Sequence, residues 1–317
     1  MKKIFFIGLL VMVLSFCVYS LDNSPIVHNR GTERILNFPT SHSLGKLYIL
    51  EKNLHFLSGS GEEEKAEAQG LVHVFVPDGW ILELRVNSES SNDLSALSKL
   101  NPNDLEAISL YDTKITDDSM KYLQKLSGLE TIDLFNTKIT GNGISHFNEL
   151  INLKTLDLTF TKINNEGLYN IKNLKNLKSL DISKTKITDS ALENIKELEK
   201  LERLDLYYTN VSDIGIKNIQ KLKGLQFLNL GWTKITDDGL SYLTGLTKLR
   251  SLNLDSTKIS DFGIQKLEKL TNLQSLSLND TNITENGLKK MSQHISPCNI
   301  DVNTIDKKRL FPFCYAK

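Results

Sequence analysis

A leucine recurs every 24 residues along most of this 317-residue chain, eight times in succession and without an insertion. The leading positions are Leu105, Leu129, Leu153, Leu177, Leu201, Leu225, Leu249 and Leu273. Self-similarity at a fixed period of roughly 20–50 residues is the signature of a solenoid, a propeller or a repeat array. Each unit is therefore expected to form one small strand-and-helix element that stacks on its neighbours.

The hydrophobic period changes within each unit. In the sixth unit, Leu228 and Leu230 alternate with polar residues, which predicts a short strand with one buried face. The leucines of GLSYLTGL (239–246) then recur every third residue, as on one face of a short helix. Thr236 or Asp237 precedes this segment and can cap its first turn. The predicted unit is strand, turn, helix, turn.

Two columns of small residues mark the predicted helix starts. The capping position is also occupied at Thr116, Thr140, Thr188, Ser212, Ser260 and Thr284. A nearby column contains Gly143, Gly167, Gly215, Gly239, Gly263 and Gly287, with Ser119 and Ala191 completing it. A column restricted to small residues predicts close backbone packing where the chain enters each helix.

A single unit cannot be stable alone. It buries about seven aliphatic side chains, each contributing roughly 1.5–3 kcal/mol. Ordering its backbone opposes folding by about 1–2 kcal/mol per residue. Stacked units cover one another's open faces and align their strands in a parallel sheet, so stability grows with the number of repeats and requires caps at both ends.

The consensus LxxLxLxxTxITDxGLxxLxxL resembles the leucine-rich repeat, in the 24-residue form found in many exported bacterial proteins. The resemblance covers residues 81–294, with one irregular repeat followed by eight regular ones. It implies an α/β horseshoe with a parallel sheet on the concave face and short helices on the convex face. The family's usual asparagine after the strand is here a threonine, so we expect a sparser hydrogen-bond ladder between coils. These threonines are Thr113, Thr137, Thr161, Thr185, Thr209, Thr233, Thr257 and Thr281.

The first residues have the pattern of a secretory signal. Two lysines precede an apolar run from Ile4 to Val18, and cleavage after Ser20 is predicted, so residues 1–20 are a signal peptide. A retained membrane anchor is the alternative, but about 15 apolar residues are fewer than the roughly 20 that span a bilayer. Lipid attachment at Cys17 is disfavoured because bulky Phe16 precedes it. We expect export to the periplasm, the cell surface or the medium, with no membrane span in the mature chain.

The regions on either side of the repeats are predicted to be caps. Residues 21–80 form an N-terminal cap, with a β-hairpin over 71–86 and a possible strand at KLYIL (46–50). The segment GSGEEEKAEAQG (59–70) is expected to be a solvated loop or short helix. At the other end, residues 295–317 form a C-terminal cap. Its Cys298 and Cys314 are expected to form a disulfide, as an even pair does in an exported protein.

Four carboxylates share one strand position on the predicted concave face. They are Asp133, Asp157, Asp181 and Asp205, and stacking places equivalent residues about 4.8 Å apart. Such a file favours a cation or a basic peptide segment. The alternative is a solvated surface neutralised by nearby basic residues. Those are Lys154, Lys178, Lys184 and Arg203. Calcium is not favoured, because a straight file does not surround an ion with oxygens.

Aromatic residues follow the same strands. They are Tyr111, Phe135, Phe160, Tyr207, Tyr208 and Trp232. Exposed aromatic side chains beside charges are typical anchors of a binding surface, and Tyr207 and Trp232 are the preferred contacts. The alternative is that these rings pack along the rim without a binding role.

The remaining features point away from catalysis and nucleic acids. Lysine plus arginine equal aspartate plus glutamate, 38 each, so net charge suggests no nucleic-acid partner. Catalytic and metal-binding motifs are absent from the sequence, and no cofactor or metal is predicted. The favoured hypothesis is an exported, non-enzymatic recognition protein that binds another protein. Two alternatives stay open: a hydrolase with its active site in residues 21–80 and the repeats as a targeting scaffold, or a passive envelope or adhesive component.

Overall fold

The computed structural model describes residues 31–52, 62–88, 93–291 and 300–302. The N-terminal strands are β1 (Gly31–Asn37), β2 (Gly45–Glu51), β3 (Glu62–Glu67), β4 (Leu71–Pro77) and β5 (Trp80–Val86). The repeat strands are β6 (Ala107–Ser109), β7 (Thr131–Asp133), β8 (Thr155–Asp157), β9 (Ser179–Asp181), β10 (Arg203–Asp205), β11 (Phe227–Asn229), β12 (Ser251–Asn253), β13 (Ser275–Ser277) and β14 (Ile300–Asp301).

Short helices alternate with the repeat strands. The α-helices are α1 (Asp117–Met120), α2 (Gly141–Ile144), α3 (Asn165–Tyr169), α4 (Asp189–Leu192), α5 (Asp213–Ile219), α6 (Asp237–Leu240), α7 (Asp261–Ile264) and α8 (Glu285–Met291). The 3-10 helices are η1 (Ser95–Lys99), η2 (Ser145–Phe147) and η3 (Gln265–Lys269). Except for α3, which follows Asn164, each α-helix begins at a predicted capping residue or directly after one.

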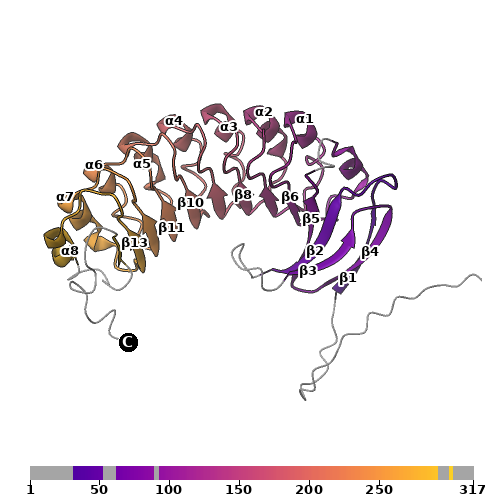
Figure 1. The fold of residues 1–317 in the computed structure, drawn as a ribbon, viewed down its shortest axis with the longest axis horizontal. Helices are drawn as coiled ribbons and strands as arrows, with labels where there is room; N and C mark the ends of the chain where they lie inside the picture. The colour runs from indigo at the N-terminus through magenta and orange to yellow at the C-terminus, as the bar shows by residue number, and fades with distance from the viewer. Residues whose placement is uncertain (1–30, 53–61, 89–92, 292–299, 303–317) are drawn as a thin grey trace, which may run out of the picture.

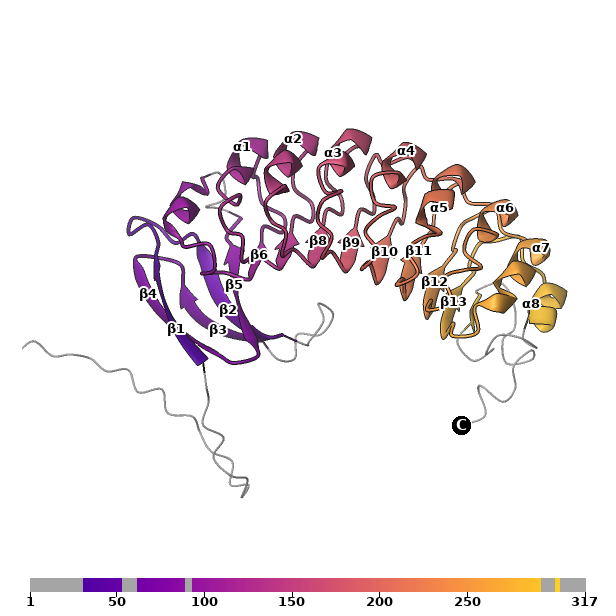
Figure 2. The same cartoon turned by 180° about the vertical axis from the view of Figure 1, so that it is seen from behind.

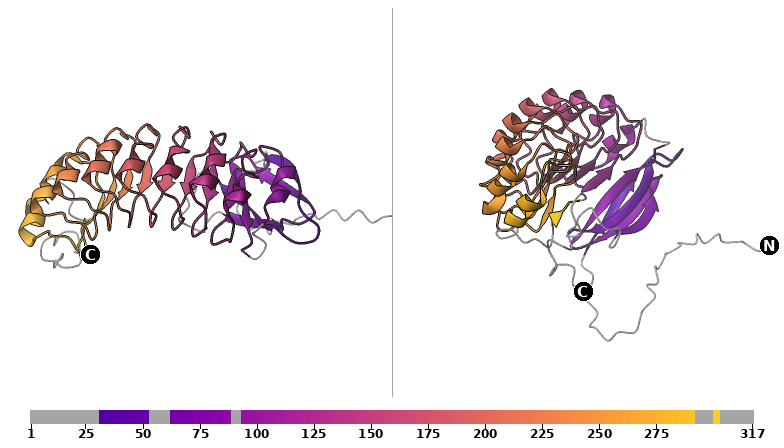
Figure 3. Two further views of the ribbon diagram at one scale, coloured as in Figure 1. Left: turned by 90° about the horizontal axis from the view of Figure 1, so that it is seen from above. Right: turned by 60° about the vertical axis from the view of Figure 1, so that its left-hand side comes forward.

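The chain forms a curved solenoid with the sheet inside the arc and the helices outside it (Figure 1). Strands β5 to β14 are parallel neighbours, and each coil, meaning one 24-residue repeat, pairs in register with the next. Ile132 pairs with Leu156, and Leu156 with Leu180. Seen from above, the helices follow one another in a single row along the convex side (Figure 3). The predicted leucine-rich repeat architecture is confirmed.

The aliphatic residues of successive coils form one continuous core. All eight leading leucines are buried, as are the strand residues that alternate with polar positions. In the central coil, Leu201, Leu204 and Leu206 are each 0% exposed. One coil cannot bury its own hydrophobic residues, so each coil depends on the coils on either side of it for stability.

The threonine that replaces the family asparagine bonds within its own coil. In all eight coils its Oγ1 donates to the carbonyl oxygen three residues earlier, at 2.6–2.8 Å. Coils are joined at this level by backbone hydrogen bonds, such as Leu206 N–H to Asn229 O at 2.9 Å. The expected sparser ladder is found, because a threonine hydroxyl has one proton and uses it locally.

Replacing Thr209 with valine, which preserves its shape, is expected to destabilise the chain by about 1 kcal/mol, because the buried carbonyl of Leu206 loses its hydroxyl donor. Thr244 makes a similar bond to Ser241 O, but at an exposed place where water can substitute. Thr244→Val is therefore the control, and the two variants are compared by chemical denaturation. Equal destabilisation by both would show that the buried bond has no special weight.

A second ladder, which the sequence did not reveal, joins the coils at their helix starts. The carboxylate of Asp213 accepts the backbone N–H of Thr236 at 2.9 Å and its hydroxyl at 2.6 Å, one coil further on. The same bidentate pairing links four further pairs of adjacent coils. They are Asp117 with Thr140, Asp189 with Ser212, Asp237 with Ser260, and Asp261 with Thr284. These aspartates therefore hold the next coil in place.

The same ladder explains most of the glycine column. A Cβ built on Gly239 would lie 2.2 Å from Oδ1 of Asp213 in the preceding coil, and one on Gly263 would lie 2.1 Å from Oδ1 of Asp237. Where the ladder residue is Asn165, the following column position is Ala191. The predicted close packing is real, and the group that approaches is a side-chain carboxylate.

The N-terminal region is a small β-structure at one end of the solenoid (Figure 2). β2 lies antiparallel to β5 and so continues the repeat sheet beyond its first parallel strand. β1 pairs with β4 in a separate two-stranded sheet. The buried face of β4, formed by Val72, Val74 and Val76, belongs to the same hydrophobic core as the repeats. The strand predicted at KLYIL (46–50) is confirmed as β2.

Two predictions for this region are wrong. Residues 71–86 contain two strands with a turn between them, but β4 and β5 do not pair as a hairpin. Both edges of β5 are already bonded, one to β2 and one to β6, so β4 must find another partner. Within GSGEEEKAEAQG (59–70), β3 pairs with β2 at the edge of the large sheet. Its glutamates suit an edge strand, because charges there discourage pairing with another chain.

Several predicted features lie outside the described residues. These are the signal peptide over 1–20, Cys17, and the disulfide between Cys298 and Cys314. Within the described ranges, no helix is long and apolar enough to cross a membrane.

Candidate concave binding face

The four predicted carboxylates lie in one file across adjacent strands. Parallel pairing aligns Asp133 with Asp157, Asp157 with Asp181, and Asp181 with Asp205. Each Oδ1 also accepts the backbone N–H two residues further on, at 2.8–3.0 Å. Asn229 and Asn253 continue the column and accept the equivalent bond. The column thus has a structural role, fixing the backbone as each strand turns towards its helix.

Burial changes the acidity of two of these groups. Desolvation, with the neighbouring carboxylate of Asp181 as the second cause, raises the pKa of Asp157 and of Asp205 to about 6. Hydrogen bonds from the backbone act in the opposite direction and are outweighed. Asp205 is only 6% exposed. The pKa values of Asp157 and Asp205 therefore lie near 6, above the ordinary 3.8 of an aspartate.

Two of the lysines expected to neutralise the file do not pair with it. Lys154 Nζ lies 2.7 Å from a carboxylate oxygen of Glu130, and Lys178 Nζ lies 3.0 Å from one of Glu202. These glutamates precede their strands at the same position as the lysines do, so the ion pairs form between adjacent coils. The expectation that Lys154 and Lys178 compensate the aspartates is wrong.

The other two basic residues lie against aromatic rings. The guanidinium of Arg203 stacks on Phe227, 3.6 Å from the ring centroid, and one of its nitrogens is 3.5 Å from Asp205. Lys184 Nζ lies 5.7 Å from the ring centroid of Phe160 and 6.0 Å from that of Tyr207. Of these four basic residues, only Arg203 acts as the predicted counter-charge, and both Arg203 and Lys184 make cation–π contacts.

The aromatic residues at the strand ends form a row, here called the aromatic row: Tyr111, Phe135, Phe160, Tyr207, Tyr208 and Trp232. Tyr111 and Phe135 are stacked with centroids 4.8 Å apart and planes 7° apart. Tyr208 contacts Tyr207 at 6.3 Å and Trp232 at 5.8 Å. The preferred pair, Tyr207 and Trp232, is thus brought together through Tyr208, a residue that the site prediction omitted.

Backbone conformation turns part of the aromatic row outwards. Phe160, Tyr208 and Trp232 have φ values of 60°, 54° and 56°, in the left-handed region, and are 53%, 57% and 51% exposed. The residue before the buried threonine is left-handed in every regular coil, so the turn itself requires this conformation. Elsewhere the position carries Asp112, Asn136, Lys184, Ser256 or Asp280. Asparagine and aspartate tolerate it best, so bulky rings there need another explanation.

The sequence contained a signal for this group. Phe160, Tyr208 and Trp232 all stand directly before the threonine column, where every regular coil makes the left-handed turn. Tyr207 occupies the position before Tyr208. Arg203 and Phe227 were missed as a pair because cation stacking depends on side-chain rotamers that the repeat pattern does not specify.

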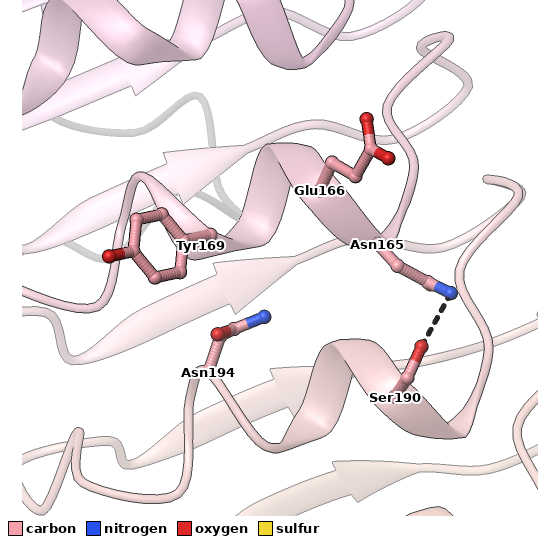
Figure 4. Close-up of a pocket in the computed structure, with 5 residues that line it drawn as sticks. All are labelled: Asn165, Glu166, Tyr169, Ser190 and Asn194. Atoms are coloured by element: carbon pink, nitrogen blue, oxygen red, sulfur yellow. Dashed lines mark hydrogen bonds between the residues drawn. The ribbon is translucent and has the colours of Figure 1, made fainter.

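The convex side also has a pocket. A pocket between α3 and α4 is lined by Asn165, Glu166, Tyr169, Ser190 and Asn194 (Figure 4). Asn165 is already engaged there, donating to Ser190 Oγ at 2.7 Å and to Thr188. Among the described residues, no group of three or more histidine, cysteine, aspartate or glutamate side chains is placed so that it could hold a metal ion.

Comparison with known proteins agrees with this geometry. Residues 106–307, more than half of the chain, match the family model of the leucine-rich repeat region. An internalin (inlF) from Listeria monocytogenes is similar in structure, with a TM-score of 0.50 and 23% identity over 68% of this chain and 71% of that one. Internalin C2 (inlC2) from the same organism has a TM-score of 0.51 and 26% identity, over 64% and 82% respectively. No curated protein matches the sequence.

Proposed function

Because the chain belongs to the leucine-rich repeat family, we propose that it is an exported, non-enzymatic recognition protein that binds another protein on its concave face. Leucine-rich repeat solenoids are scaffolds for protein interaction in general. The observation that carries the proposal is the aromatic row, which holds Tyr208 and Trp232 more than half exposed beside a file of carboxylates. Exposed, clustered tyrosine and tryptophan are the side chains that most often anchor a protein interface.

The rigidity of the face also supports this proposal. Each carboxylate is bonded to its own turn, and each turn is bonded to the next coil, so the side chains are held before a partner arrives. Preorganisation reduces the entropy lost on binding. An open, concave sheet suits a macromolecular surface better than a small substrate (Figure 1).

The N-terminal alternative, a hydrolase site within residues 21–80, gains no support from residues 31–52 and 62–80, the part of that region that the structure describes. Arg34 of β1 bonds to Glu106 of the first regular coil, and Glu62 of β3 bonds to Arg85 of β5, which also pairs with Glu83 of its own strand. The Arg34–Glu106 pair holds the cap against the solenoid.

Removing the rings tests the binding face. With mature chain as bait and a captured partner in hand, Tyr208→Ala with Trp232→Ala is expected to weaken binding more than about tenfold, since hot-spot aromatics contribute at least 2 kcal/mol each. Phe262→Ala is the matched control, because Phe262 is 66% exposed on α7 of the convex side. The affinity of the partner for the native chain, the double variant and the Phe262 variant is measured by calorimetric titration. An equal loss in the Phe262 variant, or none in the double variant, contradicts the assignment of this face.

Export is tested separately. Residues 1–20 should be absent from protein recovered outside the cytoplasm, with Leu21 as the first residue in N-terminal sequencing. Recovery of the full-length chain inside the cell would contradict export without affecting the binding face.

A further inference from the structure

The column of the aromatic row that contains Phe135 and Tyr207 has no ring in the two central coils, although Phe160 stands in the neighbouring column there. At the strand-end position where other coils carry Phe135 and Tyr207, the two intervening coils carry Thr159 and Ser183. Both are buried, and their hydroxyl oxygens are 3.2 Å apart. Rings three coils apart are separated by about 14 Å, at about 4.8 Å per strand. The face therefore has Phe135 and Tyr207 on either side of these two small residues, and the exposed ring of Phe160 beside Thr159.

Two carboxylates of this central region lack a counter-charge. Asp157 accepts the amide of Thr159 on one oxygen at 2.8 Å, and Asp181 accepts both the amide and the hydroxyl of Ser183 on one oxygen, at 3.0 and 2.7 Å. Among the described residues, neither second oxygen has a hydrogen-bond donor. The carboxylates at the two ends of the file do: Ser109 donates to Asp133 at 2.8 Å, and Asn229 to Asp205 at 3.1 Å.

The basic side chains around this region are engaged elsewhere. Lys154 and Lys178 pair with glutamates of adjacent coils, and Arg203 pairs with Asp205 at the end of the file. Lys184 is exposed at the rim, over two rings. The negative charge at Asp157 and Asp181 is thus uncompensated within the described face, while rings on either side offer apolar surface and cation–π contacts.

We propose that this face docks an extended protein segment that places a lysine or arginine side chain on Asp157 and Asp181, with flanking apolar side chains on the aromatic row. This proposal rests on the proposed function and adds the chemistry of the partner. The cation satisfies the two free carboxylate oxygens, and its alkyl stem lies against the bordering rings, as the stem of a long basic side chain commonly does. A metal ion is disfavoured, because a straight file supplies oxygens from one side only.

The test uses the mature chain and two synthetic peptides that differ in one side chain. Acetyl-Leu-Lys-Leu-amide carries the cation, and acetyl-Leu-norleucine-Leu-amide has the same stem without it. Binding is followed by the NMR shifts of the Thr159 and Ser183 amides, which bond directly to the two carboxylates. The lysine peptide is expected to give saturable shifts, with affinity about tenfold or more above that of the norleucine peptide.

The matched variant is Asp157→Asn with Asp181→Asn. Asparagine already occupies this column at Asn229 and Asn253 and keeps the bond to the turn, so the variant retains the fold while losing both charges. The proposal requires that it bind both peptides equally weakly. Equal binding of the two peptides by the native chain, or unchanged preference for lysine in the variant, overturns it, as does a larger response to Ca²⁺ alone.

The outcome is distinguishable from failure of the proposed function. If ring removal at Tyr208 and Trp232 abolishes partner capture while the lysine preference is absent, the binding face stands and only the partner's chemistry is wrong. If the lysine preference is found but partner capture survives ring removal, the cation contact stands and the wider face is wrong.

Discussion

Replacing Gly263 with alanine is expected to lower the free energy of unfolding by on the order of 2–4 kcal/mol, the sum of overpacking and of lost hydrogen bonds to a carboxylate. The new Cβ would lie 2.1 Å from Oδ1 of Asp237 and 3.1 Å from its Cα. The carboxylate cannot simply rotate away, because it accepts both the amide and the hydroxyl of Ser260, at 2.8 and 2.5 Å. One methyl group therefore breaks a link between two coils.

The chain contains both the control and the rescue. Gly245→Ala is the control, since its Cβ would meet only the flexible end of the Lys223 side chain, at 2.5 Å. For rescue, Asp237→Asn is combined with Gly263→Ala, which copies the native pairing of Asn165 with Ala191. Denaturation midpoints should fall clearly for Gly263→Ala, remain near the native value for Gly245→Ala, and partly recover in the double variant. A stable Gly263→Ala protein would mean that the carboxylate is not held as described.

The repeat period predicted nearly all of the solenoid, and the reason is physical. A period of 24 residues with no insertion leaves one way to bury every leucine, namely parallel stacking in register, and the pairing of Leu156 with Leu180 follows from it. The glycine column was visible too, but its cause was not. The glycine at 263 was expected to allow close backbone packing, whereas its neighbour is the carboxylate of Asp237 from the previous coil. The sequence does not show this contact, because it depends on how the helix starts of adjacent coils are aligned.

The N-terminal region was predicted less well because it has no repetition. LVHVFV and ILELRV alternate like two strands of a hairpin, and local sequence does not say that β5 is already bonded on both sides. The glutamates of β3 favour solvent, and an edge strand provides solvent while remaining paired. In both cases the local sequence was compatible with more than one structure, and contacts with distant segments determined which one forms.

For the concave face, the sequence predicted that Asp133, Asp157, Asp181 and Asp205 lie in one file. It did not indicate that burial raises the pKa of Asp157 and Asp205. Compensation by Lys154 was a reasonable expectation from proximity along the chain. The lysine instead reaches Glu130 of the previous coil, since residues 24 apart are closer in a solenoid than many near neighbours in sequence. Ion pairs on a repeat surface thus have to be sought between equivalent positions of adjacent coils.

Stability should rise, rather than fall, as the pH is lowered through 6. The folded-state pKa of Asp157 and of Asp205 is about 6, above the ordinary value of 3.8, so the folded chain holds these protons more tightly than the unfolded chain. The resulting stabilisation is complete below pH 3.8 and is lost as pH rises through about 6. Across this window it amounts to roughly 2–3 kcal/mol at about 1.4 kcal/mol per pKa unit, with coupling through Asp181 limiting the total.

Asp157→Asn isolates this effect, because asparagine cannot ionise and keeps the bond to the amide of Thr159. Its Nδ2 can donate to Asp133 of the preceding coil, as Asn229 donates to Asp205 of its own preceding coil at 3.1 Å. The variant should be more stable than the native chain at pH 8 by about 1–3 kcal/mol and should lose much of the pH dependence. Asp118→Asn, on the exposed side of α1, should change neither. Denaturation curves at pH 5 and pH 8 provide the measurement. A native chain that is less stable at pH 5, with an unchanged slope in Asp157→Asn, would mean that the carboxylates in the file remain hydrated and ionise as they do in the unfolded chain.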